Sequence, residues 1–149
     1  MIRALSLSLL PYQNCSSRES VHHLLWSCSF VSLLWDWATY VGVRVSGPTF
    51  SISPPLIFFA EGLNPSCTND RFIWFLVSVL KYQVWKSRCQ AMYDGSHVDP
   101  ASVLRTSKVF LKQRIQDDFN RLDRQQFFKR WSVSAKVFSV HNNQVFLHL

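Results

Sequence analysis

Three residues in the first part of the chain have the types and the spacing of zinc ligands. Cys15, His23 and Cys28 follow the pattern C-x7-H-x4-C. Structural zinc takes four nitrogen or sulfur ligands, and a thiolate in a turn followed by a His and a Cys on a helix supplies three. Tyr12 occupies the position where a C-x2-C pair would supply the fourth. Its phenol titrates far above neutral pH, so we expect zinc to be bound weakly or not at all.

The same residues also suit a protein without metal. In that alternative, Cys15 and Cys28 are buried in the core, and His23 belongs either to the core or to the surface. The four cysteines are widely and irregularly spaced, so we do not expect a disulfide framework. Cys67 and Cys89 have no neighbouring histidine pattern that would activate a thiolate, and we interpret both as unreactive thiols.

Residues for catalysis are not evident. The sequence contains no G-x-S-x-G, Walker or H-E-x-x-H motif. Asp117 and Asp118 are adjacent, and neighbours on a helix point about 100° apart, which is unsuitable for holding one metal ion together. Because basic residues surround both carboxylates, we predict surface ion pairs for them. We therefore expect a protein that is not an enzyme and has no small-molecule substrate.

The positive charge of the chain is concentrated in its second half. Residues 1–70 have three basic and four acidic side chains, a net charge of −1, whereas residues 71–149 have thirteen and five, a net charge of +8. Such a field attracts nucleic acid, an anionic membrane or an acidic protein surface alike. A solvated basic face without a partner is the plainer alternative.

The composition indicates a folded domain. Apolar residues make up 48% of the 149 positions, with six Trp and twelve Phe, which excludes a disordered tail. The longest apolar run, Phe72–Leu80, is far shorter than a membrane span, so no membrane partner is expected. The N-terminus has little resemblance to a signal peptide, and an intracellular place, nucleus or cytoplasm, is favoured over secretion. The compartment itself stays unknown.

The elements that position these residues are mainly helices. We predict helices near 20–41, with a break near Cys28 left open, near 70–93 and near 100–131, a short helix or buried run near 56–60, and a β-hairpin within 136–149. Gly42 should begin a Pro- and Gly-rich loop, and Asp99 should cap the third long helix. Leu104, Leu111, Ile115, Phe119 and Leu122 give that helix one apolar face.

The predicted fold class is mainly α, a small helical globule with a degenerate zinc-knuckle-like segment and a short C-terminal β-hairpin. Four segments follow from this pattern: an N-terminal arm (1–11), the knuckle-like segment with an aromatic helix (12–41), a Pro- and Gly-rich connection (42–70), and a basic helical region with the hairpin (71–149).

Two stretches give the sequence a resemblance to a known family. Arg18–Cys28 reads RESVHHLLWSC, and Phe30–Trp35 follows as FVSLLW. This resembles the zinc-binding segment that follows the reverse transcriptase in LINE-type (non-LTR) retrotransposon polyproteins, whose pattern is C-x2-C, Glu-Ser/Thr, His-Leu, an aromatic residue, a Cys and a downstream Trp. Cys15, His23 and Cys28 match the second to fourth ligands, and Tyr12 departs at the first.

The resemblance extends over about residues 12–135. Phe72–Trp74 and Lys81–Arg88 look like the family's helix that follows the knuckle. The family's endonuclease and polymerase domains lie upstream of this region and have no counterpart here, so none of their activities is assigned. The chain thus resembles a truncated polyprotein tail.

In the family, this tail is thought to help the polymerase hold its RNA template or DNA target, so the resemblance implies non-catalytic binding of RNA or DNA. A knuckle would place aromatic side chains against unstacked bases while a basic helix neutralises phosphates. The candidate contact residues are Trp26, Arg88, Lys112, Arg121 and Lys129. Trp26 is equally suited to the core. Two alternatives stay open: an expressed remnant with no specific activity, or a protein interaction module that uses the amphipathic third helix.

Overall fold

Helices account for most of the structure, a computed structural model that describes residues 20–132 and 137–149. In chain order the elements are η1 (His23–Ser27), α1 (Ser29–Ser46), α2 (Pro54–Phe59), α3 (Thr68–Asp94), α4 (Pro100–Arg121), α5 (Arg124–Trp131), β1 (Phe138–His141) and β2 (Gln144–Leu147). The mainly α fold with a short C-terminal hairpin is confirmed. No helix in the described ranges is long and apolar enough to cross a membrane.

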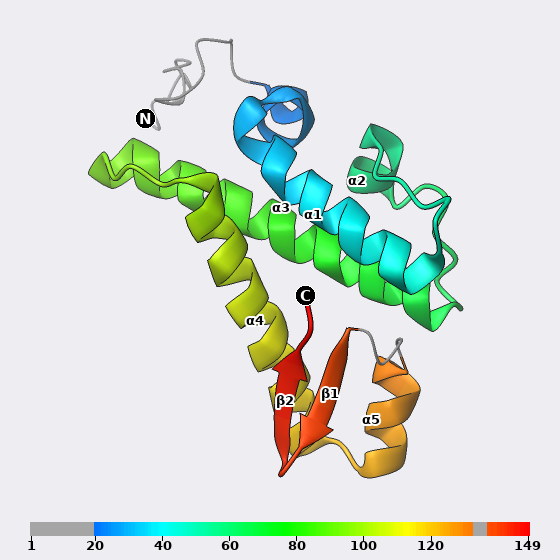
Figure 1. Ribbon diagram of the computed structural model, residues 1–149. Coiled ribbons are helices and arrows are strands. Elements are labelled where there is room, and N and C mark those ends of the chain that lie inside the picture. The colour runs from blue at the N-terminus through cyan, green and yellow to red at the C-terminus, as the bar shows by residue number, and fades with distance from the viewer. Residues whose placement is uncertain (1–19, 133–136) are drawn as a thin grey trace, which may run out of the picture.

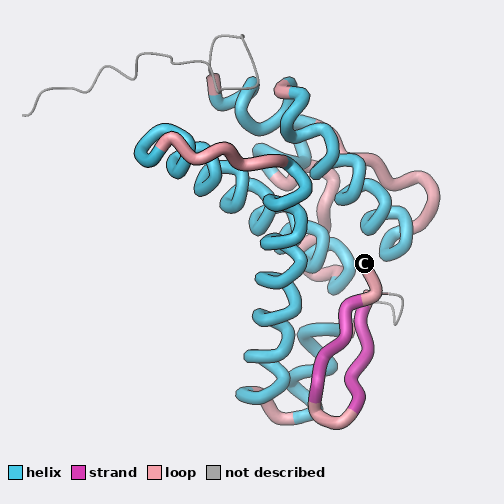
Figure 2. The backbone as a smooth tube through the Cα atoms, turned by 60° about the vertical axis from the view of Figure 1, so that its left-hand side comes forward, coloured by secondary structure: helices cyan, strands magenta, loops and turns pink. Residues whose placement is uncertain are grey.

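The core lies where α1, α3 and α4 meet. Figure 1 shows α1 lying along α3, while α4 descends from α3 towards the hairpin and α5. The segment between α3 and α4 runs back along α3 (Figure 2). Ile73, Leu76 and Val77 of α3 are fully buried, as are Leu34 and Val41 of α1. Each such side chain contributes roughly 1.5–3 kcal/mol by leaving water, which explains why the part of α3 that lies in the core is mostly apolar.

The π-helical turn η1 is separated from α1 at Cys28, where the sequence left a break open. The Cys28 N–H donates to the His23 carbonyl at 3.0 Å, a bond that spans five residues. Cys28 then has extended backbone angles (φ −75°, ψ 132°) and serves as the N-cap of α1. The change of direction lets the indole N–H of Trp35 donate to the Leu25 carbonyl at 2.7 Å, which holds the two helical segments together.

The prediction that Gly42 begins a loop is wrong. Gly42 is buried inside α1, which continues to Ser46. A Cβ at this position would lie 2.0 Å from the ring of Phe50, so any larger residue would force that ring to move. Glycine is needed here for close approach rather than for chain reversal. The helix ends at Gly47, whose φ of 104° is left-handed.

The short element predicted near 56–60 is α2. Ser53 precedes it, and its hydroxyl accepts from the Leu56 N–H at 3.4 Å. Pro54 and Pro55 follow at the first helical positions, where a missing N–H costs nothing. Buried Leu56 and Ile57 attach α2 to the core.

The third long helix is two helices rather than the single one predicted to run from 100 to 131. Leu122 is extended (φ −90°, ψ 151°), and the Asp123 carboxylate accepts from the Gln126 N–H at 2.8 Å, which caps α5. The turn brings α5 back towards α3, where Phe127 and Trp131 are buried. Asp99 caps α4 as predicted, accepting from the N–H three residues on at 2.9 Å.

The hairpin predicted within 136–149 is confirmed for the residues that the structure describes. β1 and β2 pair antiparallel, with Val140 opposite Val145. Asn142 and Asn143 form the turn, both with positive φ (50° and 60°), as a two-residue type I′ turn requires. The hairpin lies on α4, because the Val145 N–H donates to Gln116 Oε1 at 2.7 Å.

Candidate functional site

His23 and Cys28 lie at the two ends of the π turn and line the same small hollow as Arg88. Cys28 is buried and His23 is partly buried. The hollow has a volume of about 10 Å³ and is completed by the end of α3, which contributes Val84 and Ser87. Three of the residues predicted for function therefore meet at one place, although they come from sequence positions up to 65 apart.

An imidazole and a thiol at one hollow are donor types that zinc uses. They are two donors, whereas a structural site needs four. Cys15 and Tyr12 are the residues at the other two ligand positions. Both lie outside the described residues. Within 20–132 and 137–149, no group of three or more His, Cys, Asp or Glu side chains gathers in a way that would hold a metal ion. The zinc site stays a prediction.

Two of the predicted nucleic-acid contacts lie at or near this hollow rather than on the open surface. Arg88 is only 7% exposed. Trp26 is half-buried and packs against the core. By contrast, Lys112, Arg121 and Lys129 are exposed on α4 and α5. Lys112 Nζ lies 5.7 Å from the ring centroid of Phe146, so part of its charge faces the hairpin.

Asp118 and its neighbours form a cluster of ion pairs around a buried carboxylate, here called the Asp118 cluster. The carboxylate is fully buried and accepts from Arg121 Nη2 at 2.9 Å and from Trp131 Nε1 at 3.1 Å. Arg130 Nε lies 3.2 Å away and Arg114 Nη2 3.8 Å away. Three guanidinium groups thus surround one carboxylate, and the cluster retains a net positive charge.

The prediction of surface ion pairs is wrong for Asp118. The indole N–H of buried Trp131 needs an acceptor, and the α5 turn brings it to this carboxylate. Asp117 points elsewhere: it is exposed and accepts from Gln113 Nε2 at 2.8 Å. The 100° step between helix neighbours is the reason that one lies inside and the other outside.

An open pocket lies beside the Asp118 cluster, between α3, α4 and α5, and we call it the arginine pocket. Its volume is about 330 Å³. It is lined by Arg71, Phe72, Phe75, Phe110, Arg114, Arg130 and Trp131.

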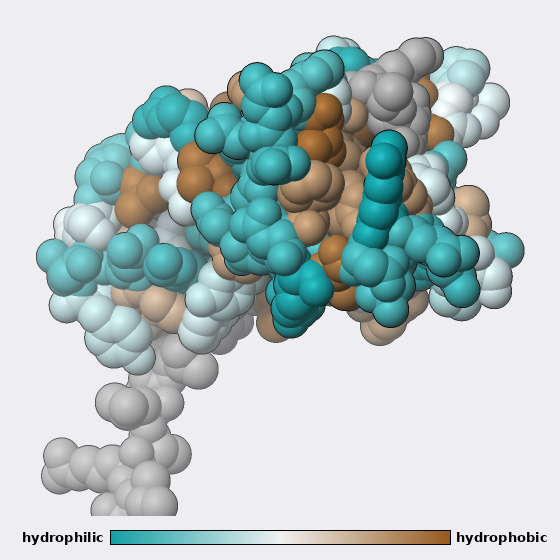
Figure 3. Space-filling view, turned by 90° about the horizontal axis from the view of Figure 1, so that it is seen from below, coloured by the Kyte–Doolittle hydropathy of each residue, from teal (hydrophilic) through white to brown (hydrophobic). Residues whose placement is uncertain are grey.

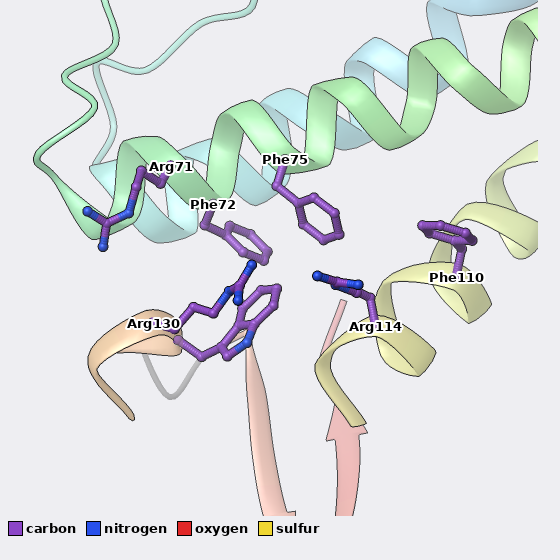
Figure 4. A pocket seen from close by; sticks show the side chains of 7 residues that line it. Arg71, Phe72, Phe75, Phe110, Arg114 and Arg130 are labelled. Carbon is purple, nitrogen blue, oxygen red and sulfur yellow. The ribbon is translucent and has the colours of Figure 1, made fainter. Parts of the chain in front are cut away.

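Several side chains of the arginine pocket have contacts that hold them in position. Figure 4 shows Arg114 extending towards Phe75 and Arg130 extending towards Phe72, whereas the guanidinium of Arg71 points away from them. The Trp131 ring meets Phe75 edge-on, with 5.7 Å between the centroids. Arg71 is held at the start of α3, where its Nη1 donates to a carbonyl at 3.2 Å. Cationic groups and aromatic faces therefore share one solvent-accessible pocket.

Sequence reasoning did not select the arginine pocket, because its residues come from three separate helices. Arg114 and Arg130 lie in the predicted third helix, the basic helix that we expect to neutralise phosphates, and Arg71 contributes only to the charge count. The signal that was available is the Asp123-x-x-Gln126 cap, which ends one helix and begins another. Recognising it would have predicted that a second helix begins after Asp123.

The surface around these helices is mixed in character. Figure 3 shows hydrophobic side chains reaching the surface between strongly hydrophilic ones on the face seen from below. Comparison with protein-family models, with curated proteins and with solved structures finds no match for this chain.

Proposed function

We propose that this chain is a non-catalytic module that binds nucleic acid, RNA or DNA, and that it derives from the C-terminal tail of a LINE-type retrotransposon polyprotein. The supporting observation is the arginine pocket, where three arginine side chains and four aromatic rings line one open space. Guanidinium groups bind phosphate through paired hydrogen bonds. Aromatic faces stack on unpaired bases.

The Asp118 cluster favours binding because it orders two of the three arginines in advance. Arg114 and Arg130 line the pocket and also lie within ion-pair distance of Asp118. Their side chains are 40% and 49% exposed, so they remain accessible to a ligand. Since less side-chain freedom is lost on binding, a larger part of the phosphate attraction contributes to affinity.

The retrotransposon origin rests on the resemblance of the knuckle-like segment. Cys15, His23 and Cys28 would hold zinc if it is bound. The metal would then join the knuckle-like segment to the start of α1. The substitution by Tyr12 at the first ligand position agrees with a remnant in which this site has decayed.

The alternative of a protein interaction module that uses the amphipathic third helix is less favoured. The apolar face of α4 is occupied within the protein itself, since Leu111 and Ile115 are fully buried. The alternative of a remnant that attracts polyanions by charge alone differs from our proposal in one testable respect, which is whether the position of the charges matters.

The test measures the affinity of the full chain for a fluorescent oligonucleotide between about 50 and 200 mM salt. One variant changes Arg71, Arg114 and Arg130 to Gln. Its matched control changes three exposed basic residues outside the pocket, Lys86, Arg105 and Arg124, to Gln. Each neutralised phosphate contributes a salt slope of about 0.9 on duplex DNA and about 0.7 on single strands.

We expect the pocket variant to lose more affinity and more salt slope than the control, although both lose the same charge. A third variant, with Lys112, Arg121 and Lys129 changed to Gln, should flatten the slope by at most about three units. Equal losses of affinity and salt slope in the three triple variants would show that charge alone attracts nucleic acid. Because Arg71 is exposed and lies outside the Asp118 cluster, Arg71→Gln alone repeats the test if the pocket triple variant does not fold.

A further inference from the structure

A second hollow adjoins the arginine pocket, and we call it the α2–α3 groove. Its volume is about 590 Å³, and its walls include Phe59, Leu63 and Trp74. Arg71 and Phe75 line both spaces. The two hollows are therefore neighbours, with one arginine side chain and one aromatic ring at their common border.

The α2–α3 groove is aromatic and accessible. Phe59 is 80% exposed at the end of α2, which is unusual for a large apolar side chain. Trp74 is partly buried, and Lys81 Nζ lies 5.0 Å from its ring centroid. The one carboxylate in the wall, Asp70, is engaged by the Asn64 N–H at 2.8 Å.

These features fit unpaired bases better than a duplex. The aromatic rings line hollows, and the bases of a duplex stay stacked inside it, so only an unstacked base can enter. Both volumes are in the range of pockets that enclose small organic groups. Arg71 lines both hollows, so it is a cation available to a phosphate that links a base in one hollow to a base in the other.

We propose that the arginine pocket and the α2–α3 groove bind neighbouring unpaired nucleotides of one single-stranded nucleic acid. One base lies against Phe75 and Phe110, a second lies against Phe59 and Trp74, and the phosphate that links them binds Arg71. This inference rests on the proposed function and adds the form of the nucleic acid that the site accepts.

The test compares three fluorescent ligands with the same number of phosphates: oligo(dT), oligo(U) and a DNA duplex hairpin. The full chain is titrated with each as wild type and as the variants Phe59→Leu and Phe110→Leu, one for each hollow. Both side chains are substantially exposed, at 80% and 44%, so replacement should leave the fold intact. Tyr93→Leu is the matched control, since Tyr93 is 85% exposed and lines neither hollow.

We expect each Phe variant to lose at least roughly fivefold in affinity for a single strand, the lower end of the contribution of one stacked base. Affinity for the duplex should not change, and the control should bind like the wild type. The difference between oligo(dT) and oligo(U) then identifies which strand is preferred. Arg71→Gln should weaken single-strand binding more than Lys86→Gln, an equal charge change elsewhere on α3.

Equal binding of duplex and single strand, with all three aromatic variants alike, would overturn this inference while leaving nucleic-acid binding in place. Absence of binding to all three ligands would overturn both proposals. Equal binding of an acidic polypeptide, such as poly-glutamate of matched charge, would also contradict the inference, because a peptide chain offers no bases to stack.

Discussion

Replacing Asp118 with Asn measures how much the Asp118 cluster contributes to stability. The amide keeps the size of the side chain and one oxygen acceptor for Trp131 Nε1. The substitution removes the charge that faces Arg121 at 2.9 Å and Arg130 at 3.2 Å. A hydrogen bond to a charged group contributes roughly 1–1.5 kcal/mol more than a neutral one, so two such bonds amount to about 2–3 kcal/mol.

The exposure of the arginines to solvent makes the actual loss of stability smaller than this free energy. The guanidinium side chains are 40% to 64% exposed and can turn to water when the carboxylate is lost. The buried amide also avoids the desolvation cost of a buried charge. We therefore expect Asp118→Asn to lower the free energy of unfolding by about 1–2 kcal/mol, equivalent to a fall in Tm of roughly 2–8 °C for a chain of this size.

The assay is urea unfolding followed by far-ultraviolet circular dichroism, with Asp117→Asn as the matched control. The control makes the same charge change one residue away, where the carboxylate is exposed and bonds only Gln113 in the described structure. It should alter the free energy of unfolding by less than about 0.5 kcal/mol. If Asp118→Asn is no more destabilising than Asp117→Asn, the buried cluster does not hold α4 and α5 together as we infer.

Three further predictions concern other parts of the chain. Gly42→Ala should lower the free energy of unfolding by about 1–3 kcal/mol, because its Cβ would meet the Phe50 ring at 2.0 Å. In a Phe50→Ala background, the same change should be neutral or stabilising when measured by urea unfolding. Hydrogen bonds from the Ser102 hydroxyl and N–H hold the pKa of Asp99 below its usual value. Its stabilising contribution is therefore complete above the ordinary carboxyl pKa and is lost as the pH falls through the lowered folded-state pKa, so Asp99→Asn should show a smaller acid dependence of the urea midpoint. Tyr12→Cys should raise zinc affinity sharply in a chelator competition titration, and stoichiometric zinc retained by the unaltered chain against a strong chelator would contradict the decayed-site hypothesis.

Local chemistry made several elements predictable. Asp99 followed by Pro100 marks a helix start in any context, because both act through the first turn alone. Asn142 and Asn143 between alternating apolar residues likewise predict a tight turn. These signals depend on neighbours in sequence, so tertiary packing did not change their outcome.

Features that depend on tertiary packing were not predictable. The apolar spacing of α4 continues through Leu122, which concealed the break that the Asp123 cap produces. Gly42 has the sequence appearance of a loop residue, and only the ring of Phe50 explains its place inside α1. The burial of Asp118 and the existence of the arginine pocket both follow from the return of α5, so the missed break concealed them as well.

The length of α3 separates the His23–Cys28 hollow from the arginine pocket. Arg71 lies in the first turn of this helix and Arg88 lies near its end, so at 1.5 Å per residue their Cα atoms are about 25 Å apart. The helix is a stiff spacer that keeps the His23–Cys28 hollow and the arginine pocket from sharing any contact residue. Sites this far apart respond to substitution independently. The free-energy changes of Cys28→Ser and Arg71→Gln should therefore add in the double variant, and a deviation from the sum would reveal a coupling that the helix alone does not provide.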